Sequence, residues 1–243
     1  MEKMFEELDF CQTSRGELSL RRRRIPMLGN EVVYEVIFNE EFLMSSLFHA
    51  AEDALADLAI QALAGCAEPL DVLVGGLGLG YTAAAALRYP NVGALRVIEV
   101  FPEVISWHQR GLVPEGCGLV ADPRCQLVAA DFFALASGDG FGGPTQKFHA
   151  ILLDIDHTPA HWLHPTHAGF YSPAGLSGLL SHLLPGGVFA MWADGNPDPD
   201  FVALLAHVFC DARAETITFP NPIRGGESCG TVYLAAAPAI ALG

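Results

Sequence analysis

Positive charge is scarce in this sequence. Its 243 residues include 13 lysines and arginines against 28 aspartates and glutamates, which gives a formal net charge of −15. Such a negative field repels phosphate backbones and favours cationic small molecules, so we expect no nucleic-acid partner. Four arginines are consecutive, at 21–24. We interpret this run as a solvated hairpin strand or turn, because it stands alone in an acidic chain.

Long apolar runs and paired cysteine motifs are also missing. No run approaches the roughly 18 apolar residues of a membrane span. The acidic start of the chain lacks the apolar core of a secretory signal. We therefore expect a soluble, cytoplasmic protein with no membrane partner. The six cysteines show no C-x-x-C spacing, which favours free thiols over a disulfide or zinc framework.

The composition predicts one large domain with a small N-terminal addition. Hydrophobic residues make up 51% of the chain and charged residues 17%, which supports a sizeable core. Residues 1–45 alternate and contain β-branched and aromatic residues, so we expect a β-rich segment there. A catalytic domain would then span residues 46–243. It would open with a helix over Leu47–Ala64, for which Ser46 is the expected N-cap.

From residue 70 onward, expected strands and helices alternate, which indicates parallel βαβ units. The last two strands have no helix between them, so we expect them to pair as an antiparallel hairpin. We predict an α/β fold of the class I S-adenosylmethionine methyltransferase (Rossmann-like) type, with a mostly parallel seven-stranded sheet. Pro185-Gly-Gly is expected to form a turn. The expected strands are 71–75, 95–100, 125–129, 148–154, 187–192, 215–219 and 231–235, and the expected helices are 81–89, 102–110, 131–136, 171–183 and 201–209.

A glycine-rich turn follows the first of these strands and precedes an alanine-rich helix. Gly76, Gly78 and Gly80 would let the backbone turn tightly and approach a ligand without a Cβ in the way. Glu99 ends the next strand, about 20 residues further on, where a carboxylate can accept the hydroxyls of a ribose. The pattern indicates a nucleoside-bearing ligand. It fits an S-adenosylmethionine turn and also the looser dinucleotide fingerprint G-x-G-x-x-A.

Acidic residues at the ends of successive strands favour the first of these ligands. Asp131 and Phe132 follow the third strand, and Asp154 follows the fourth. Ligands bind at the carboxyl ends of strands in such sheets, so the acids would meet around one site. Each acid could instead be a helix N-cap, Asp131 above all. Three acids at corresponding positions fit an adenosyl sulfonium better than a nicotinamide.

Several segments of the chain match one known family. They are Arg96-Val-Ile-Glu99, Asp122-Pro-Arg through Asp131, Phe148 through Asp154, Phe170-Tyr171 and Leu183 through Phe189. With these segments the chain resembles the spermidine synthase family, the polyamine aminopropyltransferases, over roughly residues 15–235. This resemblance implies that Glu99 holds the ribose, that Asp131 holds the adenine edge and that Asp154 lies beside the attacking amine. It also implies S-adenosylmethionine or its decarboxylated form as co-substrate, no metal, and a homodimer.

Three motifs depart from this family. Its glycine motif is usually GGGDGG, whose aspartate faces the amine of the decarboxylated donor, whereas Gly78 takes that place here. The usual D-S-S-D-P becomes Asp154-Ile-Asp156-His157-Thr-Pro. The family's Tyr-x-Glu has no clean match in segment 48–53. We therefore leave open aminopropyl or methyl transfer, with Asp154, Asp156 and His157 as candidate catalytic residues.

Four histidines lie between residues 157 and 167, around Trp162. Prolines interrupt any single helix there, so we interpret the segment as a polar, partly ordered lid over the acceptor site instead of a metal centre. Asp194 could line the acceptor pocket or begin a loop.

The sequence thus predicts a transferase that moves an aminopropyl or methyl group to a small, cationic nucleophile. The alternatives are a methyltransferase of unknown acceptor, a non-catalytic nucleoside-binding protein and an NAD-dependent oxidoreductase. The oxidoreductase would require an all-parallel end of the sheet.

Overall fold

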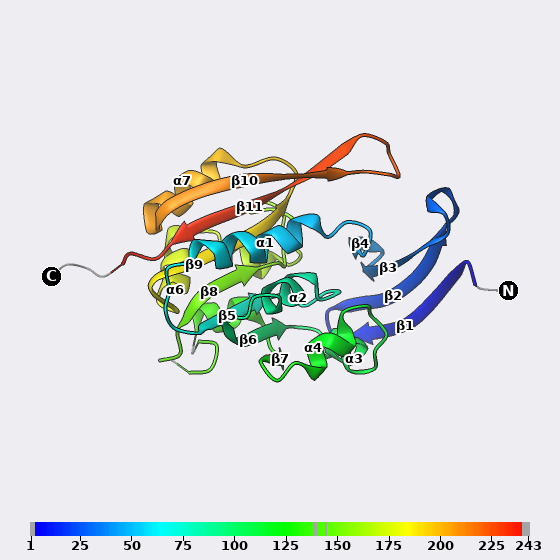
Figure 1. The fold of residues 1–243 in the computed structure, drawn as a ribbon, viewed down its shortest axis with the longest axis horizontal. Coiled ribbons are helices and arrows are strands. Elements are labelled where there is room, and N and C mark those ends of the chain that lie inside the picture. Colours follow the sequence, from blue (N-terminus) through cyan, green and yellow to red (C-terminus); the bar gives the residue numbers. More distant parts are fainter. Residues whose placement is uncertain (1–2, 139, 144, 240–243) are drawn as a thin grey trace.

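The computed structural model describes residues 3–138, 140–143 and 145–239. Its described strands form two sheets, one of four and one of seven strands (Figure 1). The four-stranded sheet is antiparallel, in the order β1-β2-β3-β4, and lies at one end of the molecule beside α3 and α4. Its strands are β1 (Phe5–Thr13), β2 (Gly16–Ile25), β3 (Glu31–Phe38) and β4 (Glu41–Ser45), with a 3-10 turn η1 (Pro26–Leu28) between β2 and β3. The predicted domain boundary at residue 45 coincides with the end of β4 and stays a prediction.

The larger sheet has the order β10-β11-β9-β8-β5-β6-β7. Neighbours from β9 to β7 pair in parallel, whereas β11 pairs antiparallel with both β9 and β10. The predicted parallel sheet with an antiparallel C-terminal hairpin is therefore confirmed, and the all-parallel alternative is excluded. The strands are β5 (Leu70–Gly75), β6 (Val92–Glu99), β7 (Cys125–Ala129), β8 (Phe148–Leu153), β9 (Leu183–Asp194), β10 (Cys210–Pro220) and β11 (Glu227–Ala236).

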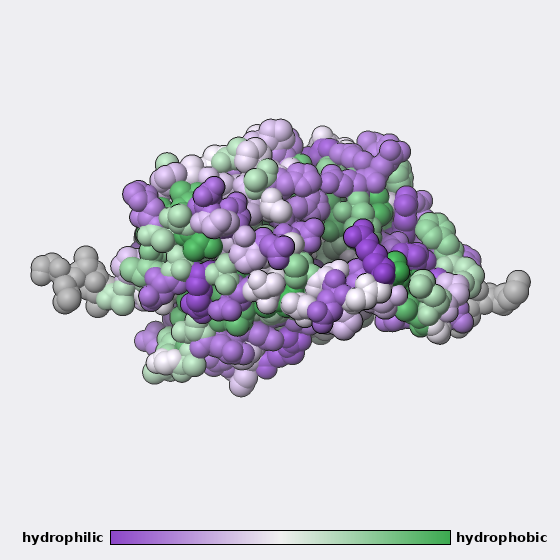
Figure 2. All heavy atoms as spheres, turned by 90° about the horizontal axis from the view of Figure 1, so that it is seen from above, coloured by the Kyte–Doolittle hydropathy of each residue, from purple (hydrophilic) through white to green (hydrophobic). Residues whose placement is uncertain are grey.

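Helices cover both faces of the larger sheet, because its central strands are apolar on both sides. One buried cluster joins α1, α2, α3 and α4 to the sheet, and a second joins α5, α6 and α7 to the opposite face. The outer surface mixes hydrophilic residues with small hydrophobic areas on the face that Figure 2 shows. The helices are α1 (Ala50–Ala62), α2 (Tyr81–Leu87), α3 (Pro102–Gln109), α4 (Gly116–Ala121), α5 (Phe132–Ser137), α6 (Pro173–Leu180) and α7 (Pro199–Val208), with a 3-10 turn η2 (Pro165–Gly169) before α6.

Two local predictions were wrong, and one short helix was missed. Helix α1 begins at Ala50, since the Ser46 hydroxyl accepts a hydrogen bond from the Tyr34 amide of β3 (3.0 Å) and caps no helix. Pro185-Gly-Gly lies inside β9, as an irregularity in its pairing with β8 and not as a turn before it. Helix α4 was not predicted. It contains two glycines, one of which, Gly116, packs so closely on the His108 backbone that a side chain would not fit.

The arginine run lies on β2, where acidic residues of the neighbouring strands pair with it. Arg21 and Arg22 face Glu7 and Glu6 of β1, and Arg23 lies 2.7 Å from Glu35 of β3. The arginine side chains stay accessible to solvent, so these pairs contribute little to stability, but they neutralise the local positive charge. Among the described helices, none is long and apolar enough to cross a bilayer.

Candidate active site

A cavity of about 220 Å³ opens at the carboxyl ends of β5, β6, β7 and β8. Seven of the nine candidate residues line it, whereas Gly80 and Asp156 do not. The N-terminal sheet contributes further walls through Arg15, Phe38 and Met44. The candidates that line the cavity are Gly76, Gly78, Glu99, Asp131, Phe132, Asp154 and His157. The topology thus brings residues together that are far apart in the chain, as expected for a sheet of this kind.

The three glycines of the turn have positive φ angles, at +95° for Gly76, +47° for Gly78 and +94° for Gly80. A Cβ at position 76 would overlap the carbonyl oxygen of Asp154, so this glycine is required by close approach as well as by conformation. At position 78 a Cβ would overlap the sulfur of Met44, which also accepts a hydrogen bond from the Leu79 amide (3.2 Å). The thioether of Met44 therefore occupies the place beside Gly78 where a side chain would lie.

Glu99 holds the glycine turn in place through hydrogen bonds to backbone amides. Its carboxylate accepts hydrogen bonds from the amides of Leu77 (3.0 Å) and Phe101 (2.8 Å), and only 7% of the residue is exposed. Burial raises the pKa of this carboxyl, while the backbone hydrogen bonds oppose the shift. The carboxylate is thus held rigidly at the cavity wall, where it can accept ligand hydroxyls.

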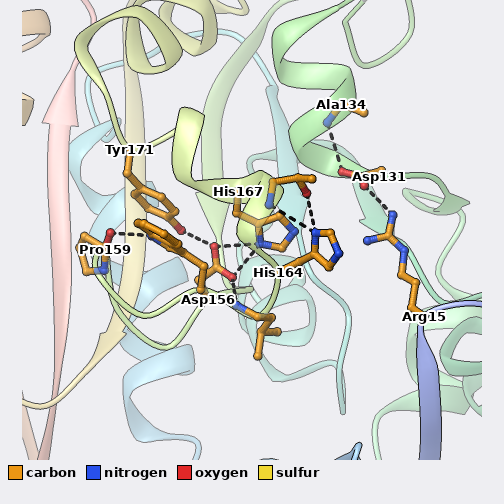
Figure 3. A network of polar contacts seen from close by, with 11 residues as sticks. Arg15, Asp131, Ala134, Asp156, Pro159, His164, His167 and Tyr171 are labelled. Carbon is orange, nitrogen blue, oxygen red and sulfur yellow. Dashed lines mark hydrogen bonds and ion pairs between the residues drawn. The ribbon is translucent and has the colours of Figure 1, made fainter.

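Asp131 is both an N-cap and a cavity residue. One oxygen accepts a hydrogen bond from the Ala134 amide of α5 (3.1 Å), and the other lies 2.7 Å from the Arg15 guanidinium. Burial alone would raise its pKa, but these two donors outweigh it and leave the pKa lowered. Figure 3 shows Arg15 reaching Asp131 from the N-terminal sheet. The adjacent Phe132 ring lies beneath Gly75, where a Cβ would meet it at 2.5 Å.

Asp154 shares the cavity lining with a second acid, Glu52. The Thr82 hydroxyl donates to the Asp154 carboxylate (2.7 Å) and lies 3.4 Å from the carbonyl oxygen of Glu52. Burial raises the pKa of Asp154 to about 6, against the Thr82 hydrogen bond. Burial and the Asp154 charge raise the pKa of Glu52 to about 8. Sequence analysis did not select Glu52, because nothing in its helical segment separates a cavity acid from a surface acid.

Asp156 lies beneath the cavity wall and is fully buried. Its carboxylate accepts hydrogen bonds from the Leu163 amide (2.8 Å) and the Tyr171 hydroxyl (2.8 Å), and lies 2.8 Å from Nδ1 of His167 (Figure 3). Burial and the neighbouring carboxylate raise the pKa of Tyr171 well above its ordinary value. These contacts tie together the segment between β8 and α6.

Replacing Asp156 by asparagine is expected to destabilise the protein by about 2 kcal/mol, because at least one buried donor loses its acceptor. Tyr171→Phe, which removes one donor and leaves the carboxylate in place, should cost about 1 kcal/mol. Urea unfolding of both variants checks this order. Equal stability of Asp156→Asn and the wild type would contradict it.

The histidine segment lines the cavity through His157, His164 and His167. His167 stacks on Phe133 with ring centroids 3.9 Å apart, and His157 lies 3.4 Å from Glu41 of β4. Within the described ranges, no group of three or more histidines, cysteines or acids is placed to hold a metal ion. Asp194 is exposed at the end of β9 and does not line the cavity.

Sequence comparisons relate the chain to one group of enzymes. It is 27% identical over 164 residues to polyamine aminopropyltransferase 2 of Pseudomonas aeruginosa, which covers 63% of this chain and 44% of that protein. It is 30% identical over 154 residues to the polyamine aminopropyltransferase of Prochlorococcus marinus, covering 61% and 50%. The resemblance to polyamine aminopropyltransferases is confirmed. The aligned part spans about half the length of these curated relatives, and no protein-family model matches the chain.

Solved structures confirm the predicted fold. The spermidine synthase of Thermotoga maritima superposes with a TM-score of 0.70 at 18% identity, over 96% of this chain and 74% of that one. Human methyltransferase-like protein 13, solved in complex with SAH, gives a TM-score of 0.52 at 22% identity, over 79% and 82%. Both neighbours thus share the class I methyltransferase-like architecture with this chain.

Proposed function

We propose that this protein transfers an aminopropyl group from a decarboxylated adenosyl-sulfonium donor to a small amine. The observation that carries this proposal is that two acids, Asp154 and Glu52, line the same cavity as the glycine turn. Polyamine aminopropyltransferases are similar to the chain in sequence, which supports the same reaction. A negative cavity end suits both a sulfonium and an amine acceptor.

The proposed step needs only a positioned base. The acceptor nitrogen attacks the methylene carbon next to sulfur, a new C–N bond forms, and the C–S bond breaks with its electron pair remaining on sulfur. The products are the aminopropylated amine and neutral methylthioadenosine. The proton of the attacking nitrogen passes to Asp154, whose raised pKa of about 6 suits a base near neutral pH. The sulfonium is already a good leaving group, so positioning supplies much of the rate.

The adenosine part of the donor would bind along β6 and β7. Glu99 would accept the ribose hydroxyls, and Asp131 with Phe132 would border the adenine. Arg15 already occupies one Asp131 oxygen, so Asp131 could offer the adenine amino group only its remaining acceptor capacity. His157 is available beside the acceptor, whereas the burial of Asp156 supports a positioning role for it.

Methyl transfer is the second candidate, and one observation favours it. The glycine turn has no acid at Gly78, and Met44 fills the space there. A carboxylate-bearing donor would then meet less repulsion from the turn itself. Glu52 weighs against this reading, because it places an acid at the cavity from α1.

A product assay tests the proposal. The purified protein is incubated with putrescine and either S-adenosylmethionine or its decarboxylated form, and the nucleoside product is separated by chromatography. We expect methylthioadenosine from the decarboxylated donor and little product from S-adenosylmethionine. S-adenosylhomocysteine as the main product would favour methyl transfer, and binding of methylthioadenosine without turnover would favour a non-catalytic protein.

The homodimer and the cytoplasmic location implied earlier remain predictions. Phe5 and Phe10, exposed by 55% and 52% on β1, are candidate contact residues. Light scattering of the purified chain tests the dimer.

A further inference from the structure

The carboxyls of Glu52 and Asp154 form an acid pair inside the cavity, contributed by different layers of the fold. Glu52 lies in the first turn of α1, is 7% exposed and lines the cavity. Asp154 follows β8 and lines the same cavity. Thr82 at the start of α2 contacts both residues, through the carboxylate of Asp154 and the carbonyl oxygen of Glu52. Both residues therefore contact Thr82, and both line the same cavity.

The pair has no cationic partner among the residues that the structure describes. Asp53, the neighbour of Glu52 on α1, is occupied by His49 and Arg88 and lies outside the cavity lining. Arg15, which does line the cavity, is paired with Asp131 beyond β7. The other acids and histidines of the cavity lining are Glu99 of β6, Asp131 after β7, and His157, His164 and His167 after β8, and Tyr81 of α2 lies near Glu52 outside the lining.

We propose that Glu52 and Asp154 share one proton in the free protein and release it when a ligand ammonium group binds between them. This inference rests on the proposed function, since it concerns the amine-binding end of the same cavity. It adds Glu52 as a binding residue and states how many protons are released when the ligand binds. The protonated Glu52, the Asp154 carboxylate and the ammonium become two carboxylates and an ammonium, and one proton passes to solvent.

The pKa of both carboxyls is raised, which supports this balance. Burial and the Asp154 charge hold the pKa of Glu52 near 8, whereas that of Asp154 lies near 6. Between these values the pair carries one proton and one negative charge, because like charges in a buried site disfavour the doubly ionised form. A bound ammonium supplies the missing positive charge and reverses that preference.

The affinity for an ammonium ligand is therefore expected to rise about tenfold per pH unit between pH 6 and 8, and to level off above pH 8. Aliphatic amines stay protonated throughout this window. A neutral ligand such as methylthioadenosine should bind with nearly constant affinity. Putrescine and the decarboxylated donor each carry an ammonium, and their separate titrations show which of them the pair accepts.

Calorimetric titration in buffers of different ionisation enthalpy measures the proton release directly. For the wild type at pH 7 we expect close to one proton released per ammonium ligand bound, and none for methylthioadenosine. Glu52→Gln should abolish the release, flatten the pH dependence and weaken ammonium binding about tenfold or more. Asp57→Asn is the matched control: it removes a surface acid of the same helix, which pairs with Arg88 and Tyr89, and should behave as the wild type.

A measurement without ligand separates this inference from the proposed function. A carboxyl whose pKa is higher in the folded state contributes stability that is lost as pH rises towards that value. The urea midpoint of the wild type should thus fall between pH 5 and 8 by more than that of Glu52→Gln. Equal decreases of the urea midpoint in the two proteins would contradict the proposal that the pair shares one proton. Amine binding without proton release would contradict it as well. Normal titration of the pair with no adenosyl-sulfonium turnover would overturn the proposed function alone.

Discussion

Replacing Asp154 by asparagine is expected to lower kcat by about 10²–10⁴-fold, the range for removing a positioned general base. Asparagine keeps the shape of the side chain and an oxygen that can accept from Thr82, but it cannot take the proton of the attacking nitrogen. The affinity for methylthioadenosine, which has no aminopropyl group and no ammonium, should change little. Initial rates of methylthioadenosine formation, with putrescine and the decarboxylated donor varied in turn, check the prediction.

The pattern of kinetic constants decides between catalysis and binding. A loss in kcat and kcat/KM together would identify an interaction made in the transition state, whereas an increase in KM alone would show that Asp154 only binds the amine. Asp57→Asn serves again as control, since it changes the charge equally on a surface outside the cavity. Wild-type kcat in Asp154→Asn would rule out Asp154 as the proton acceptor.

The sheet and its ligand-binding edge could be predicted from sequence because their signals are local. A short apolar strand followed by glycine or an acid repeats at β5, β6, β7 and β8. Parallel pairing then places the strand ends at one edge. Glu99 and Asp154 were selected on this basis, and both line the cavity. The hairpin of β10 and β11 was predictable in the same way, since the connection is too short for a helical crossover.

The rest of the site depends on contacts between distant segments, which periodicity cannot reveal. Arg15 reaches Asp131 across 116 positions of the chain, and Met44 of β4 lies beside Gly78. Glu52 shares the cavity with Asp154 because α1 packs against both α2 and β8. Asp156 shows a second limit of prediction from sequence, in which a local pattern suggests a role that the surrounding fold does not support. Its place near a strand end resembles that of a catalytic acid, yet the segment after it folds back and buries its carboxylate.

The glycine turn also shows how one missing side chain can be interpreted in two ways. From sequence, Gly78 indicates that an acid has been lost from the cavity. In the structure, Met44 takes up that space and Glu52 brings an acid from another element. The charge of the cavity therefore depends on several elements of the fold and not on the glycine turn alone. At Gly76 only glycine fits the turn, because φ is positive and a Cβ would overlap the Asp154 carbonyl oxygen.

Gly76→Ala is expected to destabilise the protein by about 3–5 kcal/mol, from the positive φ and from overpacking together. The φ of +95° disfavours any side chain, and the added methyl would overlap the Asp154 carbonyl oxygen, which belongs to the backbone and cannot rotate away. Gly225→Ala isolates the first effect, because its φ is +77° with no atom near the added methyl, and should cost about 1–2 kcal/mol. Urea unfolding of both variants measures the difference. Because relief of the overlap must move Asp154 away from Gly76, Gly76→Ala should also lose turnover, whereas Gly225→Ala should keep it. Equal stabilities of the two variants would show that β5 and β8 do not approach so closely at the cavity.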